Sequence, residues 1–150
     1  MADQLQLQIQ TTRESVQSAG EAASRWLADR GVPVNVQYFA NLAIEEFSTN
    51  CIKYGYDDAQ LHWLEVSLSL GQEALVMTIV DDGRPFNPLE APAPDLTLAV
   101  EERPIGGLGI YLVRRMADRM EYARQGDKNR LTLHKFLAPH DGACLHPKTC

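Results

Sequence analysis

The sequence predicts an α+β fold, a two-layer α/β sandwich in which helices pack on one face of a mixed, mainly antiparallel sheet. Residues 4–10 and 64–80 have the alternating or continuously apolar pattern of strands, while the segments on either side of residue 32 repeat at helical spacing. The 150-residue chain is 45% hydrophobic, which is enough for one core. We therefore expect a single domain over residues 1–137 and a flexible tail over 138–150.

The charge balance limits the classes of partner. Lys and Arg number 14 against 20 Asp and Glu, a net charge of -6 at pH 7. Nucleic-acid binders need clustered positive charge, so we expect no nucleic-acid partner. No apolar run approaches the ~18 residues of a bilayer span, and the first residues lack a basic leader start. We expect a soluble, cytoplasmic protein with no membrane partner, whose three cysteines stay reduced.

The first two elements follow from simple periodicities. Residues 4–10 alternate leucine or isoleucine with glutamine, which predicts a half-buried strand that could lie at a sheet edge. Thr11 and Glu14 then have the spacing of a capping box. The helix that they would open continues in apolar residues at helical spacing until Gly31 and Pro33 stop it.

A second helix is expected from about residue 35 to Gly55. Its core-facing residues share one arc of the helical wheel: Val36, Ala43, Ile44, Phe47, Cys51 and Tyr54. Along one border of this arc, Asn50 lies about 40° from Glu46 and Lys53 about 20° on the other side. Glu45 points away from that border.

The side chains along this border, Glu46, Asn50 and Lys53, are of the types that take part in phosphate transfer. An amide oxygen such as that of Asn50 can ligate Mg²⁺, while a nearby carboxylate such as that of Glu46 can orient or deprotonate a nucleophile. The segment alone leaves an alternative open, because adjacent glutamates on a helix usually form a solvated face.

The second half of the chain predicts a hairpin, a loop, a helix and a last strand. Residues 64–70 and 74–80 form the hairpin. Residues 85–104 hold five of the eight prolines and should be a loop. A third helix is expected over residues 106–122 and a strand over 129–137, with these helix residues inward: Leu112, Val113, Met116, Ala117 and Met120.

Two glycine-containing stretches could meet a nucleotide. Asp81 ends the apolar strand and could accept a hydrogen bond from an exocyclic amine, while Gly83 would let the backbone pass close to a flat ring. Gly107 and Gly109 open the third helix, where free amides and the positive helix end suit phosphate. Each stretch alone could instead be an ordinary turn or a hinge.

Together with the central helix, these stretches resemble the ATP-binding domains of gyrase B subunits, heat-shock chaperones, sensor histidine kinases and anti-sigma-factor kinases. The Glu-x-x-x-Asn, Asp-x-Gly and Gly-x-Gly boxes of that superfamily occur here in the expected order, within residues 35–137. The run from Asp81 to Phe86 is similar to the anti-sigma serine/threonine kinases. The superfamily fold is the sandwich that the residue patterns already predict.

The resemblance implies a role for each matching residue. Asn50 would ligate Mg²⁺ and Lys53 would reach a phosphate oxygen. Glu46 would be the catalytic base toward a serine or threonine hydroxyl.

For the nucleotide itself, the resemblance implies that Asp81 and Gly83 bind adenine and that Gly107 and Gly109 lie at the phosphates. Thr132 would support the adenine-binding aspartate. Residues 88–105 would form a lid over the bound nucleotide, and Arg103 in that lid is as consistent with a solvated surface as with a γ-phosphate contact.

We therefore expect an ATP- and Mg²⁺-dependent serine/threonine kinase that acts as an anti-sigma regulatory factor. Its partner would be a sigma factor, an antagonist protein, or both, and a homodimer is left open. The alternatives are a nucleotide-binding adaptor that transfers no phosphate, an ATPase, and a detached sensor-kinase domain. In the tail, the histidines and cysteines could ligate zinc or belong to a frayed end: His140, Cys144, His146 and Cys150.

Overall fold

The computed structural model describes residues 3–91, 97 and 107–138. Its five strands form one sheet in the order β1-β2-β3-β5-β4, and every neighbouring pair is antiparallel. The strands are β1 (Asp3–Gln10), β2 (Trp63–Leu70), β3 (Ala74–Asp81), β4 (Arg119–Gln125) and β5 (Lys128–Phe136). The predicted α+β class is confirmed, and the sheet is antiparallel throughout rather than mixed.

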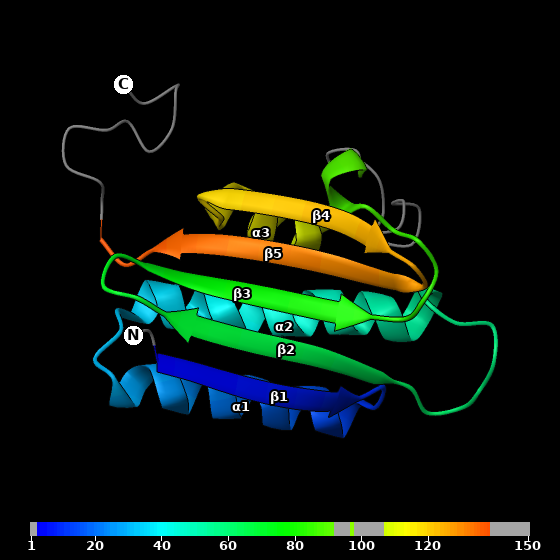
Figure 1. Cartoon of the computed structure of the whole chain (residues 1–150), viewed down its shortest axis with the longest axis horizontal. Coiled ribbons are helices and arrows are strands. Elements are labelled where there is room, and N and C mark those ends of the chain that lie inside the picture. Colours follow the sequence, from blue (N-terminus) through cyan, green and yellow to red (C-terminus); the bar gives the residue numbers. More distant parts are fainter. Residues whose placement is uncertain (1–2, 92–96, 98–106, 139–150) are drawn as a thin grey trace.

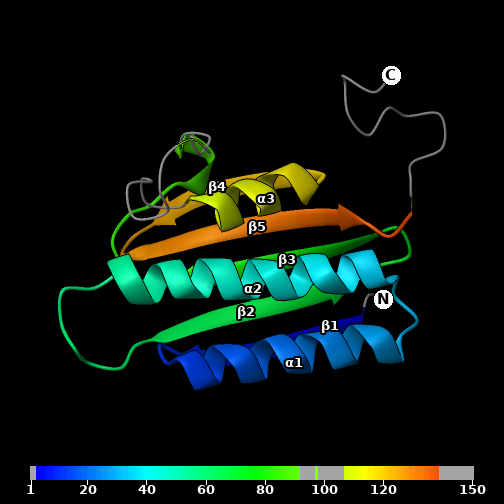
Figure 2. The same cartoon turned by 180° about the vertical axis from the view of Figure 1, so that it is seen from behind.

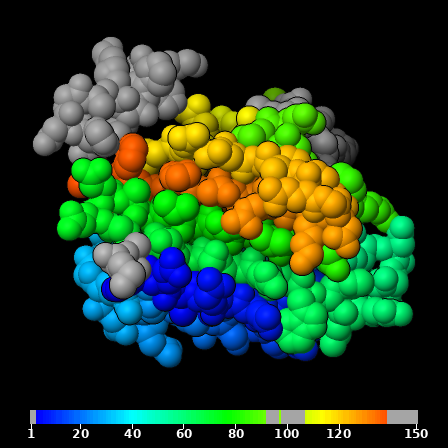
Figure 3. Space-filling model, in the orientation of Figure 1, coloured from blue at the N-terminus to red at the C-terminus, as the bar shows by residue number. Residues whose placement is uncertain are grey.

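The helices lie together on one face of this sheet (Figures 1 and 2). They are α1 (Arg13–Asp29), α2 (Val34–Tyr54) and α3 (Leu108–Met116), and a short 3-10 turn, η1 (Pro88–Glu90), follows β3. The opposite face of the sheet is the one that Figure 3 presents, with the strands crossing it from blue β1 to orange β5. In the described chain, no helix has the length and apolar character of a bilayer span.

The core lies between the helices and the inward side of the strands. Alternate positions of β2 and β3 are buried, as period-2 patterning requires, and so is the inward face of α2. The largest fully buried side chains include Phe39, Ile44, Leu64, Leu68, Met77 and Leu133. Tyr54, predicted to face the core, is 43% exposed, because it lines an open pocket at the end of α2.

The prediction of a helix over residues 106–122 is wrong beyond Met116, where α3 ends. Ala117 is already extended, and the Asp118 N–H donates to the His134 carbonyl oxygen at 2.9 Å, which leads the chain into the sheet. Lys135 Nζ donates to the Met116 carbonyl oxygen at 2.7 Å and so caps the helix end. Residues 119–122 have adequate helix propensity, but antiparallel pairing with β5 overrides it.

Smaller differences have local causes. The N-cap of α1 is Thr12, whose side chain accepts from the Ser15 N–H, whereas Thr11 bonds to His62. Leu112, expected inward, is 39% exposed, because the buried side of α3 is the one that carries Ile110 and Val113. Gly126, with φ 62°, allows the tight turn between β4 and β5.

Candidate functional site

A pocket opens where the end of α2 passes over the ends of β3 and β5. It has a volume of about 200 Å³ and combines apolar walls with the side chains of Asn50 and Asp81. Its apolar lining includes Phe47, Ile79, Phe86 and Leu131. This volume is below the roughly 300 to 1,000 Å³ usual for a drug-sized ligand, so it suits one flat ring system rather than a whole nucleotide.

Asp81 and Gly83 form a tight turn at the pocket edge. The Gly83 N–H donates to Asp81 Oδ1 at 2.9 Å, and the next N–H, of Arg84, donates to the Gly55 carbonyl oxygen at 2.9 Å. A Cβ at position 83 would lie 3.0 Å from that same Gly55 oxygen. The absence of a side chain at Gly83 therefore lets the turn approach the end of α2 closely.

Asn129, which was not predicted from the sequence, holds this turn from the opposite strand. It is 6% exposed and pairs with Asp81 across β3 and β5. Its Nδ2 donates to Asp81 Oδ1 at 3.0 Å and to the Arg84 carbonyl oxygen at 2.7 Å, while its Oδ1 accepts from the Tyr122 hydroxyl. Asn129 thereby fixes the orientation of the Asp81 carboxylate.

Thr132 does not reach Asp81. It pairs with Thr78 in the middle of the sheet, and its side chain is out of phase with the buried positions of β5, Asn129, Leu131 and Leu133. That alternation was visible in the sequence and could have pointed to Asn129 as the inward polar residue at the strand end.

Glu46 lies one turn of α2 before Asn50 and is half-buried. Burial raises the pKa of its carboxyl above that of a free glutamate, and the negative charge of Glu45 raises it further, whereas the positive charge of Lys53 lowers it. The raised pKa makes this carboxylate a better proton acceptor than an exposed one.

Gly109 brings the start of α3 directly against Glu46. A Cβ at position 109 would overlap the Glu46 carboxylate, so any side chain there would require that carboxylate to move. Gly107 is the N-cap of the same helix, and its carbonyl oxygen accepts from the Tyr111 N–H at 3.2 Å. The structure thus brings the Glu-x-x-x-Asn box of α2 and the Gly-x-Gly box of α3 together.

Lys53 lies apart from the pocket. It is exposed and, with Glu45, lines a groove of about 820 Å³ between α1 and α2. This groove is larger than the pocket, but neither Asn50 nor Asp81 lines it. We therefore place the candidate site at the smaller pocket.

Several predicted features are not covered by the structure. Arg103 and most of the predicted lid lie outside the described residues, as do the four tail residues considered as zinc ligands. Within the described chain, no group of three or more His, Cys, Asp or Glu side chains could hold a metal ion.

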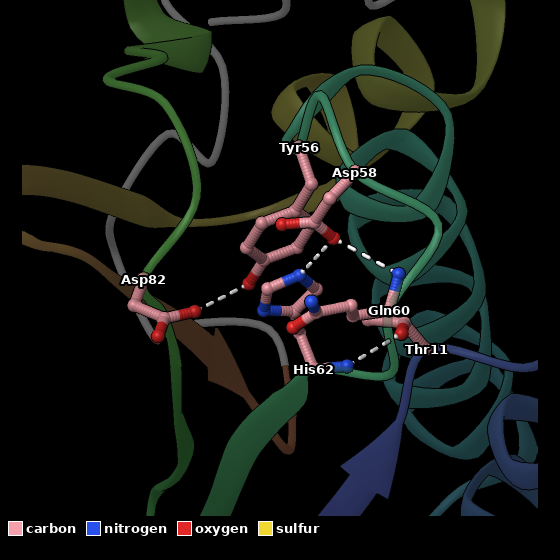
Figure 4. Close-up of polar contacts among 6 residues, drawn as sticks. All are labelled: Thr11, Tyr56, Asp58, Gln60, His62 and Asp82. Atoms are coloured by element: carbon pink, nitrogen blue, oxygen red, sulfur yellow. Dashed lines mark hydrogen bonds and ion pairs between the residues drawn. The ribbon is translucent and has the colours of Figure 1, made fainter.

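A polar cluster in the loop after α2 supports the other side of the Asp81 turn (Figure 4). The Tyr56 hydroxyl donates to Asp82 Oδ1 at 2.5 Å, and the Tyr56 and His62 rings stack with centroids 3.6 Å apart. His62 Nε2 lies 2.7 Å from Asp58 Oδ1, and the His62 N–H donates to Thr11. The cluster links the pocket turn to the β1–α1 junction, and no sequence motif indicates it.

Two pKa shifts describe the chemistry beside the pocket. Burial, followed by the hydrogen bond to Asp82, raises the pKa of Tyr56, so its hydroxyl stays a donor. Burial and then the Asp81 charge raise the pKa of the Cys51 thiol to about 12. Cys51 is therefore a neutral lining group and not a reactive thiolate.

The antiparallel sheet, the helices on one face, the pocket lined by Asn50 and Asp81, and the start of α3 beside Glu46 define the class, an α+β nucleotide-binding domain. Comparison with known families agrees with this class. The chain belongs to the histidine kinase-like ATPase domain family, whose model matches residues 9–135.

Two relatives illustrate the similarity. The serine/threonine-protein kinase BtrW of Bordetella bronchiseptica (strain ATCC BAA-588 / NCTC 13252 / RB50) is 24% identical over 115 residues, which is 77% of each chain. The crystal structure of the RsbU and RsbW domains of Rv1364c from Mycobacterium tuberculosis is 16% identical with a TM-score of 0.63. That likeness covers 89% of this chain but 32% of the longer chain, and at this identity it supports the fold alone.

Proposed function

We propose that this protein is a cytoplasmic ATP-dependent serine/threonine protein kinase that acts as an anti-sigma regulatory factor. In this proposal the chain binds a sigma factor, an antagonist protein or both, and phosphorylates a serine or threonine of the antagonist. Family membership supports nucleotide chemistry in general, and the likeness to BtrW favours a hydroxyl acceptor.

The observation that carries the proposal is the position of the Glu46 carboxylate. It is half-buried with a raised pKa, one helical turn from Asn50, and it lies against Gly109 at the start of α3. A general base for an incoming hydroxyl needs a carboxylate of raised basicity beside the phosphate-binding elements. Glu45, which faces the other groove, lacks this placement.

The residues around the pocket fit ATP and Mg²⁺. Asp81, fixed by Asn129 and Gly83, would accept from the adenine amine between apolar walls. Asn50 would contribute one oxygen to Mg²⁺, which in proteins commonly takes few protein ligands and completes its shell with phosphates and water. The amides at the start of α3, near Gly107, would face the phosphates. Bound Mg²⁺ would supply charge neutralisation for phosphoryl transfer.

Transfer from labelled ATP to protein tests the proposal. The chain is incubated with γ-labelled ATP, Mg²⁺ and candidate antagonist proteins, and labelled residues are identified. Label on serine or threonine is the expected result. Nucleotide binding without label would support an adaptor, and phosphate release that is independent of any acceptor would support an ATPase. Label on histidine would contradict the hydroxyl-acceptor proposal.

A further inference from the structure

The turn that carries Asp81, residues 81–84, is held from two sides of the pocket. On the β5 side, Asn129 Nδ2 donates to Asp81 Oδ1 at 3.0 Å. On the other side, Asp82 Oδ1 accepts from the Tyr56 hydroxyl at 2.5 Å, as Figure 4 shows. Because Asp82 directly follows Asp81 in the chain, the position of the Asp81 carboxylate depends on Tyr56 as well as on Asn129.

Tyr56 lies in the loop between α2 and β2, and the ring of His62 stacks on it. The two ring centroids are 3.6 Å apart and the ring planes differ by only 4°. Stacked aromatic pairs contribute stabilisation beyond the area that they bury. Removing the His62 ring would therefore loosen Tyr56 and weaken the hold of its hydroxyl on Asp82.

His62 is itself fixed at its ring and at its backbone. Its Nε2 lies 2.7 Å from Asp58 Oδ1, and this hydrogen bond lowers the pKa of Asp58, which therefore stays ionised and holds the ring. The His62 N–H donates to Thr11 Oγ1 at 2.9 Å, and its carbonyl oxygen accepts from the Thr11 N–H at 3.0 Å. The stack on Tyr56 is thereby anchored to the junction of β1 and α1, outside the pocket.

We propose that His62 is a positioning residue that sets the selectivity of the pocket for the exocyclic amine of adenine, acting through the Tyr56 hydroxyl on the Asp81 turn. The role of His62 rests on the adenine contact of Asp81 proposed above. Asp81 Oδ1 already accepts two hydrogen bonds within the protein, so the amine contact is assigned to Oδ2. A hydrogen bond weakens steeply when its angle is lost. Loosening the turn should therefore affect recognition of the amine more than the rest of the nucleotide.

The test compares ATP with purine riboside triphosphate, which lacks only the exocyclic amine. Isothermal titration with Mg²⁺ gives the dissociation constants of both nucleotides, and circular dichroism checks the fold of each variant. His62→Ala should bind ATP about fivefold to tenfold more weakly, the range typical of one hydrogen bond, and bind the analogue as the wild type does. His62→Phe keeps a ring on Tyr56 and should restore most of the ATP affinity. His134→Ala, at the end of β5 away from the pocket, is the matched control.

Tyr56→Phe tests the route from His62 to the turn. It removes one oxygen atom and keeps the stacked ring, so it also serves if His62→Ala does not fold. Tyr56→Phe should lose affinity for ATP and not for the analogue. Adding His62→Ala to Tyr56→Phe should weaken ATP binding little further, because both changes act through the same hydrogen bond to Asp82. Fully additive losses would contradict this route.

Equal losses of affinity for both nucleotides in His62→Ala would overturn the proposal, because they would show a structural role only. So would unchanged discrimination in His62→Ala while Asp81→Asn loses it. A wild type that binds both nucleotides equally, or an Asp81→Asn protein that still prefers ATP as the wild type does, would contradict the adenine contact itself and with it the role of His62.

Discussion

Glu46 is the side chain on which the proposed chemistry depends most, and its raised pKa makes the activity pH-dependent. It must be deprotonated to accept a proton, so the transfer rate should fall as pH drops through a pKa above that of free glutamate. Glu45→Gln removes a neighbouring negative charge and lowers this pKa. The acid limb of the rate profile should move to lower pH while the plateau is unchanged.

Glu73→Gln is the matched control for this prediction, because Glu73 is exposed at the far end of the sheet, in the β2–β3 turn. An acid limb that moves equally in both variants, or to higher pH in Glu45→Gln, would show that the Glu45 charge does not act on the base.

Asn129 and Thr132 lie on the same strand and should differ sharply when replaced. Asn129→Ala leaves the Arg84 carbonyl without a donor and Asp81 without its fixed orientation, at a cost of about 1 to 3 kcal/mol for an unmatched buried group. ATP affinity by isothermal titration should fall by roughly one to two decades. Thr132→Ala should bind ATP as the wild type does. Equal losses in both variants would contradict the assignment of Asn129.

Asn50 offers a test of the proposed metal ligand. Asn50→Ala removes an amide oxygen from the pocket lining without disturbing the apolar face of α2. Wild-type affinity for ATP should drop when EDTA removes Mg²⁺, whereas the variant should bind weakly with or without the metal. Full Mg²⁺ dependence in Asn50→Ala would mean that another group holds the ion.

At the scale of elements, the contact between α2 and α3 is what joins two sequence boxes into one site. Gly109→Ala should displace the Glu46 carboxylate, because the new Cβ would occupy its space. Alanine favours helix over glycine, so α3 itself should not be weakened. We expect at least about a tenfold loss of transfer rate, a lower limit for disturbing general-base catalysis worth about 10² to 10⁴.

A double-mutant cycle identifies the route of this effect. If Gly109→Ala acts through Glu46, the double variant should transfer phosphate at nearly the same rate as Glu46→Gln alone. Fully additive losses would indicate that Gly109 acts separately, for example through the amides at the helix start.

At the scale of the whole molecule, periodicity predicted the class and most elements because apolar side chains at period 2 or 3.6 must face one core. β4 was missed because its residues favour a helix locally, and only the partner strand β5 decides otherwise. In the site, Asn50 and Asp81 do line one pocket. The alternation of β5 marks Asn129 as an inward residue, but its bond to Asp81 and the role of the Tyr56 loop depend on contacts between distant segments, which no motif encodes.

The proposed kinase activity depends on the Glu46 carboxylate acting as the base for phosphoryl transfer. The most direct test is the single-turnover rate of transfer from ATP to an acceptor protein in Glu46→Gln, measured together with ATP affinity. We expect near wild-type affinity and a rate lower by about 10² to 10⁴. A Glu46→Gln protein that transfers phosphate at nearly the wild-type rate would contradict it.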